Sequence, residues 1–282
     1  MNNNLLLKRF FSKSTLADLL SQKKNSVFDC VIKRYVKDPD GKTYDALISE
    51  IYTFMGKEYR TEYLYKNTIL NKLLFAKHDY KKTVALTELP IDKSKADFVM
   101  INGRGVVYEI KTELDNLDRI ESQIQDYYKA FTEVVVVTYE DNLAKVMDTV
   151  PQSVGIMVLT KRQSLKSIRN AEIVDKYLDY YTIFKILRKN EFEQIILDNR
   201  LTLPQVIQFE YYKKCYSLIT NIDVYKLQKD MLEQLKSRMR IETIEFCIDS
   251  PKELRLLTYF DNTLRSKRSE FETTMKKSYG GG

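Results

Sequence analysis

Histidine is almost absent from this chain of 282 residues, since His78 is its one histidine. Catalytic triads that depend on histidine and zinc sites rich in histidine therefore have almost no material. The sequence also contains no GxxxxGK[ST] phosphate-binding loop, no GxGxxG dinucleotide motif and no GxSxG nucleophile elbow. If the protein is an enzyme, carboxylates, lysines and a bound metal ion must carry its chemistry.

Long apolar runs and paired cysteines are missing too. No apolar run approaches the roughly 20 residues that a membrane helix needs, and the three leucines at 5–7 are far shorter than the roughly 7–15 apolar residues of a secretory signal. The three cysteines, Cys30, Cys215 and Cys247, lie far apart and form no CxxC pair. We therefore expect no membrane partner, and a cytoplasmic protein with reduced thiols.

Basic residues outnumber acidic ones by 46 to 39, which gives a net charge of +7. The excess is concentrated near the ends, with net +4 over residues 1–40 and net +3 over residues 251–282. This balance favours a polyanionic partner, although it supplies attraction without sequence information. Solvated tails are the alternative explanation for both basic segments.

The pattern of apolar residues divides the chain into three predicted parts. Residues 1–56 indicate a helical leader, and residues 161–282 indicate a helical C-terminal domain. Between them, residues 57–160 alternate between helix and strand. The alternation predicts an α/β fold in which helices flank a mixed central sheet.

The individual elements follow from spacing and turn signals. The predicted helices are 16–20, 45–54, 58–77, 117–131, 173–187, 204–219 and 224–239, and the predicted strands are 84–89, 96–101, 106–111, 134–137 and 154–159. Asn102-Gly103 between two β-branched runs predicts a hairpin. Tyrosines are dense in the last third; packing is the favoured explanation and stacking on single-stranded bases is the alternative.

Chemistry-bearing side chains gather on the predicted hairpin. Residues two apart on a strand point to the same face, so Glu109 and Lys111 project together and Ile110 points to the opposite, buried face. The hairpin brings Asp97 of the preceding strand close to them. Two carboxylates and an amine are thus expected on one face of the sheet.

Such a group suits a hard divalent cation, either Mg²⁺ or Mn²⁺. The predicted ligands are Asp97, Glu109, the backbone carbonyl of Ile110, and Glu62 from the first long helix. Lys111 is placed to orient a metal-bound water, to take its proton or to stabilise charge on phosphorus. The alternatives are a solvent-facing strand of alternating charge, and a Glu62–Lys66 pair along the helix.

These residues resemble the PD-(D/E)XK, or restriction-endonuclease-like, superfamily. The resemblance is carried by segments 60–67, 87–89, 94–97 and 108–113, and it extends to a group of small bacterial nuclease-like proteins. It implies a restriction-endonuclease-like core over residues 57–160. The proline that commonly precedes the aspartate is replaced by Ala96.

The resemblance implies a role for each matching residue. It makes Asp97, Glu109 and Glu62 the metal-binding acids, Lys111 the catalytic lysine, and Gln123 a polar residue near the site. An exposed helix glutamine is the alternative for Gln123. Four further charged residues lie in or near the matched segments, and a surface ion pair is the alternative for each: Glu88, Lys95, Glu113 and Asp115.

The expected function is therefore hydrolysis of phosphodiester bonds by a metal-dependent nuclease. DNA is the favoured partner and RNA the alternative, and a homodimer would let two sites cut both strands. Two rival functions stay open: a nucleic-acid-binding protein that does not cleave, and a partner-activated toxin or interaction protein that binds through the C-terminal helices.

Overall fold

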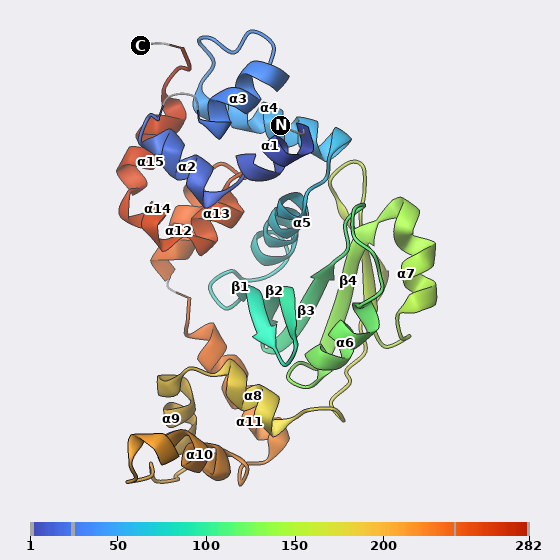
Figure 1. Cartoon of the computed structure of the whole chain (residues 1–282), viewed down its shortest axis with the longest axis vertical. Coiled ribbons are helices and arrows are strands. Elements are labelled where there is room, and N and C mark those ends of the chain that lie inside the picture. The colour runs from blue at the N-terminus through green and yellow to red at the C-terminus, as the bar shows by residue number, and fades with distance from the viewer. Residues whose placement is uncertain (1–2, 24–25, 240, 281–282) are drawn as a thin grey trace. The chain divides into compact units, whose positions relative to one another are not determined.

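The computed structural model describes residues 3–23, 26–239 and 241–280 (Figure 1). The chain folds into two compact units. Unit 1 contains the described residues of 1–77, 160–164 and 240–282, and unit 2 contains residues 78–159 and 165–239. No helix in the described ranges is long and apolar enough to cross a membrane.

Unit 2 is built on a six-stranded sheet in the order β1-β2-β3-β4-β5-β6. Its strands are β1 (Val84–Ile91), β2 (Ser94–Asn102), β3 (Arg104–Ile110), β4 (Glu133–Tyr139), β5 (Gly155–Leu159) and β6 (Leu165–Arg169). The β3–β4 and β4–β5 pairs are parallel and the other three pairs are antiparallel. The predicted mixed α/β fold is confirmed. The edge strand β6 was not predicted, because its sequence has too few apolar residues to show a strand pattern.

The predicted hairpin joins β2 to β3. Asn102 pairs with Arg104, and Gly103 forms the turn with φ of +68°, in the left-handed region that favours glycine. Next to this hairpin, β4 is buried along Glu133–Thr138. Its run of four valines is covered on both faces, as expected for a strand inside a layered α/β structure.

The helices of unit 2 lie between and after the strands. They are α6 (Ile120–Tyr128), the 3₁₀ turn η2 (Glu140–Asn142), α7 (Leu143–Thr149), α8 (Tyr180–Ile186), α9 (Lys189–Asp198), α10 (Gln208–Ile219) and α11 (Val224–Lys236). Figure 1 shows α6 against one face of the sheet, where Ile120, Ile124 and Tyr127 enter the core. The spacing of these three residues had predicted this buried face.

Two helices of unit 2 begin four or more residues later than their sequence pattern predicted. The predicted helix 173–187 is helical only in α8, because the carboxylate of Asp179 caps it by accepting hydrogen bonds from the N–H and hydroxyl of Thr182. The predicted helix 204–219 begins at Gln208, so Pro204 lies before the helix and not in its first turn.

A buried ion pair ties α9 to Arg238, two residues after the end of α11. The carboxylate of Glu191 accepts hydrogen bonds from Arg238 Nε and Nη2 at 2.7 and 2.6 Å, and from the backbone N–H of Arg188. Arg238 also donates to the carbonyl of Ile186. Burial acts to raise the pKa of Glu191, but the Arg238 and Arg188 hydrogen bonds together outweigh it and hold that pKa below its usual value.

We expect Glu191→Gln to destabilise unit 2 in a pH-dependent way. A lowered carboxyl pKa contributes stability above the pKa of the unfolded chain, and this stability is lost as the pH falls through the folded pKa. The variant should therefore lose about 2 kcal/mol at pH 7 and less at pH 3. Urea denaturation at both pH values measures this, with the exposed Glu233→Gln on α11 as control. Equal losses at both pH values would contradict the assignment.

Unit 1 is helical and draws on both ends of the chain. Its elements are α1 (Asn3–Phe10), α2 (Lys13–Leu20), α3 (Val27–Tyr35), α4 (Tyr44–Glu58), α5 (Glu62–Ile69), the π-helix η1 (Leu70–Phe75), α12 (Ile241–Asp249), α13 (Arg255–Phe260), α14 (Asn262–Ser266) and α15 (Arg268–Lys276). The predicted helices 16–20 and 45–54 are confirmed. The predicted helix 58–77 is present as α5 and η1, whose hydrogen-bond pattern changes at Leu70.

Candidate functional site

The strand register places three carboxylates in one row across the sheet. Thr87 pairs with Phe98 and Leu89 with Ala96, so Glu88 on β1 lies opposite Asp97 on β2. Continuing the pairing of Phe98 with Tyr108 places Glu109 on β3 opposite Asp97 from the other side. This carboxylate row, Glu88–Asp97–Glu109, is the candidate functional site of unit 2.

The buried end of the row is Glu109, which is only 2% exposed. Its carboxylate lies 2.9 Å from Lys111 Nζ and accepts a hydrogen bond of 2.6 Å from the hydroxyl of Tyr127. Lys111 Nζ also donates to the side-chain oxygen of Gln123 at 2.8 Å. The structure thus brings Glu109, Lys111 and Gln123 together as the sequence predicted, in a network where each charge has a partner.

Tyr127 belongs to this network, although the sequence pattern assigned it only to the apolar stripe of α6. Burial, and next the negative charge of Glu109, raise the pKa of Tyr127 well above its usual value. The hydroxyl therefore stays protonated and donates to Glu109. A tyrosine in a helix stripe above a strand that carries a carboxylate is the signal that would have found it.

Backbone bonds fix the positions of these side chains. The carboxylate of Asp97 accepts a hydrogen bond of 2.8 Å from the N–H of Ile110. The N–H of Lys111 donates to the carbonyl of Val137 on β4, and the Lys111 carbonyl accepts from the hydroxyl of Thr138. Ile110 therefore contacts the site through its backbone N–H, whereas the group predicted as a metal ligand was its backbone carbonyl.

The open end of the row is Glu88, whose side chain is 45% exposed. Its φ is +55°, in the left-handed region, at the point where β1 passes Asp97. A carboxylate oxygen of Glu88 lies within 4.8 Å of one of Asp97, and Lys95 Nζ lies 2.5 Å from Glu88. A single residue in a left-handed conformation within a strand marks a position that the surrounding structure enforces.

Oxygen donors this close suit a hard divalent cation. Glu88 and Asp97 are the pair best placed to hold one in unit 2, because Glu88 is half-exposed and close to Asp97, whereas Glu109 is buried. The sequence had named Glu109 as a metal ligand and had left Glu88 as one of four secondary residues. The cross-strand pairing across β1 was the missing information.

Two other acidic residues named from the sequence have partners close to them along the chain. Glu62 belongs to unit 1, where it begins α5 and its carboxylate lies 2.5 Å from Lys66 Nζ, one helical turn further on. Asp115 closes a turn by accepting hydrogen bonds from the N–H and hydroxyl of Thr112. The pair with Lys66 is the alternative that the sequence had left open for Glu62.

The net positive charge of the chain is not shared evenly between the units. The residues of unit 1 include 24 lysines and arginines against 15 acids, or net +9, whereas those of unit 2 include 22 against 24, or net −2. The basic excess near both ends of the sequence therefore becomes one strongly basic folded unit. A unit of this charge attracts polyanions.

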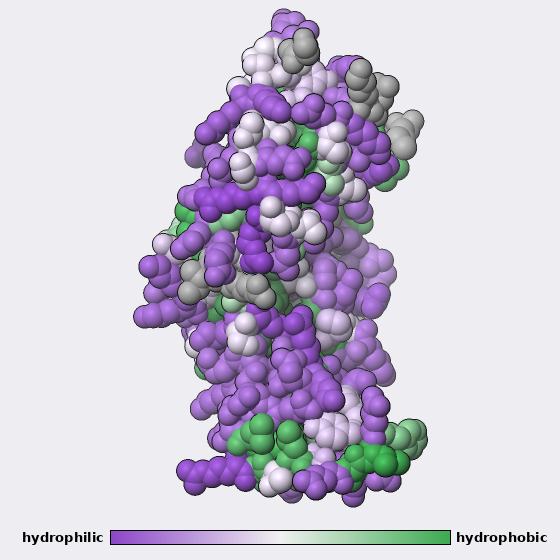
Figure 2. All heavy atoms as spheres, turned by 90° about the vertical axis from the view of Figure 1, so that its left-hand side faces the viewer, coloured by the Kyte–Doolittle hydropathy of each residue, from purple (hydrophilic) through white to green (hydrophobic). Residues whose placement is uncertain are grey.

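Unit 2 also exposes apolar side chains at the start of α10. Phe209 is 92% exposed and Ile207 is 70% exposed, and Val206 lies beside them in the sequence. In Figure 2 hydrophobic atoms gather at the end of the view where Figure 1 places α10. The predicted protein partner and homodimer stay predictions, and this surface is where an apolar contact would form.

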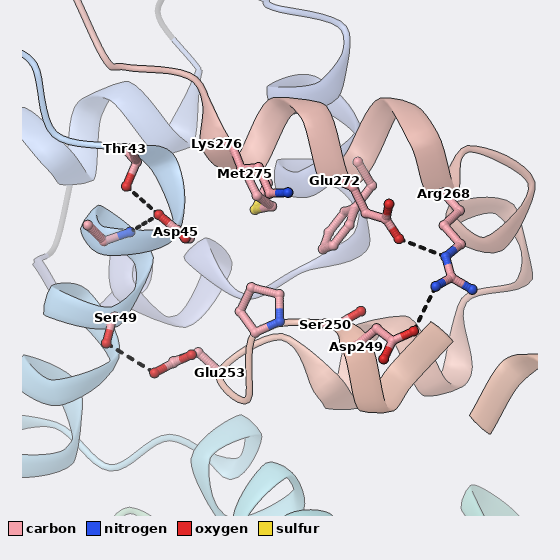
Figure 3. A pocket seen from close by; sticks show the side chains of 13 residues that line it. Thr43, Asp45, Ser49, Asp249, Ser250, Glu253, Arg268, Glu272, Met275 and Lys276 are labelled. Carbon is pink, nitrogen blue, oxygen red and sulfur yellow. Dashed lines mark hydrogen bonds and ion pairs between the residues drawn. The ribbon is translucent and has the colours of Figure 1, made fainter. Parts of the chain in front are cut away.

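A pocket of about 790 Å³ in unit 1 lies among α4, residues 249–253 and α15 (Figure 3). Arg268 donates to Asp249 and Glu272 at 2.7 Å each, and Ser49 donates to Glu253 at 3.0 Å. Its charged side chains thus serve mainly to tie the surrounding helices together.

Cys30, Cys215 and Cys247 are free thiols, as expected.

Comparison with known proteins gives three findings. A family model described as bacteriophage P4 protein cII matches residues 55–254. Protein cII of Enterobacteria phage P4 is 20% identical over 156 residues, which cover 54% of this chain and 57% of that protein, so the match spans little more than half the length of the relative. A protein of unknown function from Silicibacter pomeroyi gives a TM-score of 0.32 and 14% identity, over 47% of this chain and 88% of that one.

The family match corrects two predictions. The assignment to the PD-(D/E)XK superfamily is wrong, and the nuclease activity that it implied is wrong with it, because the matching family is a different one and covers the whole predicted nuclease core. The acid and lysine spacing that suggested a nuclease forms instead a buried network around Glu109. On the match over residues 55–254, the chain belongs to the bacteriophage P4 protein cII family.

Proposed function

We propose that this member of the P4 cII family is a cytoplasmic DNA-binding protein that does not cleave DNA. Unit 1 binds the phosphate backbone, and unit 2 holds a divalent cation, Mg²⁺ or Mn²⁺, at Glu88 and Asp97. The observation that carries the proposal is the separation of charge, net +9 in unit 1 against net −2 in unit 2. The binding experiment also distinguishes RNA from DNA as the partner.

Electrostatics supports a nucleic acid as the partner of unit 1. Lysines and arginines that neutralise backbone phosphates release counterions, which makes affinity high at low salt and steeply dependent on salt. Lys33 and Arg34 are both exposed in the last turn of α3. Cations at the C-terminal end of a helix also complement its dipole, so this end presents charge at little cost in stability.

The two carboxylates support a cation in unit 2. Mg²⁺ usually keeps several waters and takes one or two protein carboxylates, which matches Glu88 with Asp97. Bound there, the cation would neutralise two negative charges in a unit whose net charge is already negative. The ammonium group of Lys111 remains bound to Glu109 and Gln123. It therefore holds Glu109 in place at the β3 end of the carboxylate row.

The experiment measures binding of labelled duplex DNA, single-stranded DNA and RNA by fluorescence anisotropy between 50 and 300 mM salt. We expect Lys33→Glu/Arg34→Glu to weaken binding about tenfold or more and to lower the salt slope by roughly one per lost phosphate contact. Lys213→Glu/Lys214→Glu on α10 is the matched control, because it reverses an exposed basic pair in unit 2. If reversing the α10 pair weakens binding and reversing the α3 pair does not, unit 1 is not the binding surface.

The cation is tested in the same samples. Calorimetric titration with Mn²⁺ should show binding that Asp97→Asn removes and that Asp141→Asn, an exposed aspartate on η2, leaves unchanged. Denaturing gels of the recovered DNA should show full-length strands with Mg²⁺ or Mn²⁺. Shortened strands that appear only with metal would overturn the non-cleaving function, and equal Mn²⁺ binding in both variants would remove the cation from Asp97.

A further inference from the structure

A second pocket opens in unit 2, and it shares no residue with the carboxylate row. Its volume is about 1200 Å³, enough for a ligand the size of a nucleotide. Its walls come from the turn after β1, α6, the segment before β5, the segment after β6 and the start of α8. The residues that matter for its chemistry are Lys93, Tyr128, Glu172, Lys176, Tyr177 and Tyr181.

Exposed aromatic rings are the first feature of this pocket. Tyr177 is 54% exposed and Tyr181 is 52% exposed. Tyr180, in contrast, serves the fold, because its hydroxyl donates a hydrogen bond to a backbone carbonyl. The ring of Tyr177 lies 6.4 Å from that of Tyr128, at an angle of 37°. Tyr128 is buried and supports the ring that is open to a ligand.

The charged groups of the pocket divide into two sets. Lys129 is bound to both Asp92 and Asp126, and Asp179 caps α8, so these groups serve the fold. Lys93, Lys176, Glu121 and Glu172 make no ion pair within the described part of unit 2, although Lys176 Nζ lies 4.9 Å from the centre of the Tyr177 ring. Two amines and two carboxylates are thus left beside the exposed rings.

Glu172 lines the pocket together with Tyr128 and Ser153. Burial is the main cause that raises the pKa of Tyr128, and the negative charge of Glu172 raises it further. The hydroxyl of Tyr128 lies 3.2 Å from that of Ser153, whose carbonyl accepts a hydrogen bond from the N–H of Glu172. The backbone of Glu172 is therefore held at the wall formed by Tyr128 and Ser153, within the same pocket as the open tyrosine rings.

We propose that this pocket binds a nucleotide. The base stacks on Tyr177, Glu172 accepts a hydrogen bond from an exocyclic amino group of the base, and Lys93 and Lys176 bind the phosphate. A nucleotide can use a ring face, a carboxylate and an amine at once. The inference goes beyond the proposed function, because it needs neither the divalent cation nor the basic unit 1.

The test is calorimetric titration of the full chain with dAMP, dCMP, dGMP and dTMP in EDTA. We expect dTMP to bind about tenfold more weakly than the other three, because its base has no exocyclic amino group to donate to Glu172 and its ring N3–H lies at a different position. Tyr177→Ala should weaken dAMP binding about tenfold, and Tyr177→Phe should retain it. Tyr225→Ala, another half-exposed tyrosine of unit 2, is the matched control.

The contribution of the two lysines to phosphate binding is tested by comparing dAMP with deoxyadenosine, which has no phosphate. In Lys93→Ala/Lys176→Ala, dAMP should bind only as tightly as deoxyadenosine, whereas the unchanged protein should prefer dAMP. No binding of any of the four nucleotides at millimolar concentration would overturn the proposal, as would equal affinity in Tyr177→Ala and the unchanged protein. The absence of metal and polymer separates these results from a failure of DNA binding by unit 1.

Discussion

Lys111→Met should lower the free energy of unfolding by about 3 kcal/mol or more. Lys111 is the cation that partners the carboxylate of Glu109, a side chain only 2% exposed, at 2.9 Å. Removing it leaves a buried negative charge with the Tyr127 hydroxyl as its remaining hydrogen-bond donor among the side chains described around it. Methionine retains most of the volume of the lysine stem. The loss of stability therefore measures the effect of removing the charge and not the effect of opening a cavity.

A double variant separates the charge from the fold. Glu109→Gln/Lys111→Met removes both members of the pair, and we expect it to recover a large part of the stability lost by Lys111→Met alone. Urea denaturation followed by circular dichroism measures all three chains. Lys95→Met is the matched control, because Lys95 pairs with Glu88 at the exposed end of the carboxylate row and its loss should cost less than about 1 kcal/mol.

Two results would contradict this account of the network. A loss below about 1 kcal/mol in Lys111→Met would show that Glu109 is solvated or neutral in the folded chain. A double variant as unstable as the single one would show that Lys111 acts through packing or through Gln123. In either case the buried network would not be the reason why this strand carries a glutamate and a lysine two residues apart.

The sequence predicted the hairpin part of this site well, for a physical reason. Side chains alternate along a strand, and the Asn-Gly turn fixes the register, so the neighbourhood of Asp97, Glu109 and Lys111 follows from local pattern. Glu88 and Tyr127 join the site through β1 pairing and through the docking of α6. Both are long-range events that local spacing does not encode, and both were missed as members of the site.

The same locality explains the wrong family assignment. An acid followed about a dozen residues later by [DE]-x-K is a short pattern, and any strand with a buried acid–lysine pair can show it. The structure contains the predicted neighbours, but the pattern alone does not distinguish a reactive group from a pair that stabilises a sheet. Unit 1, in which residues 240–282 join residues 1–77, likewise depends on contacts far apart in the sequence.

Asn67→Ala should be the most damaging single change in unit 1, with a loss of about 3 kcal/mol. Asn67 lies in α5, is fully buried, and donates to the hydroxyl of Tyr52 at 3.0 Å and to the carbonyl of Lys252 at 2.9 Å. Its oxygen accepts a hydrogen bond of 3.0 Å from the N–H of Leu256. Truncation would leave the buried N–H of Leu256 without its acceptor and the hydroxyl of Tyr52 without its donor.

Asn71→Ala provides the control, because Asn71 lies one helical turn further on and also donates to the Lys252 carbonyl, at 3.0 Å. That carbonyl keeps its bond to Asn67 in the control, so we expect a loss of about 1 kcal/mol. Hydrogen exchange should show faster exchange at Leu256 and in α13 in Asn67→Ala, and little change there in Asn71→Ala. Equal effects of the two variants would mean that the segment carrying Lys252 and Leu256 is held by apolar packing, and that the buried asparagine does not join the two ends of the chain.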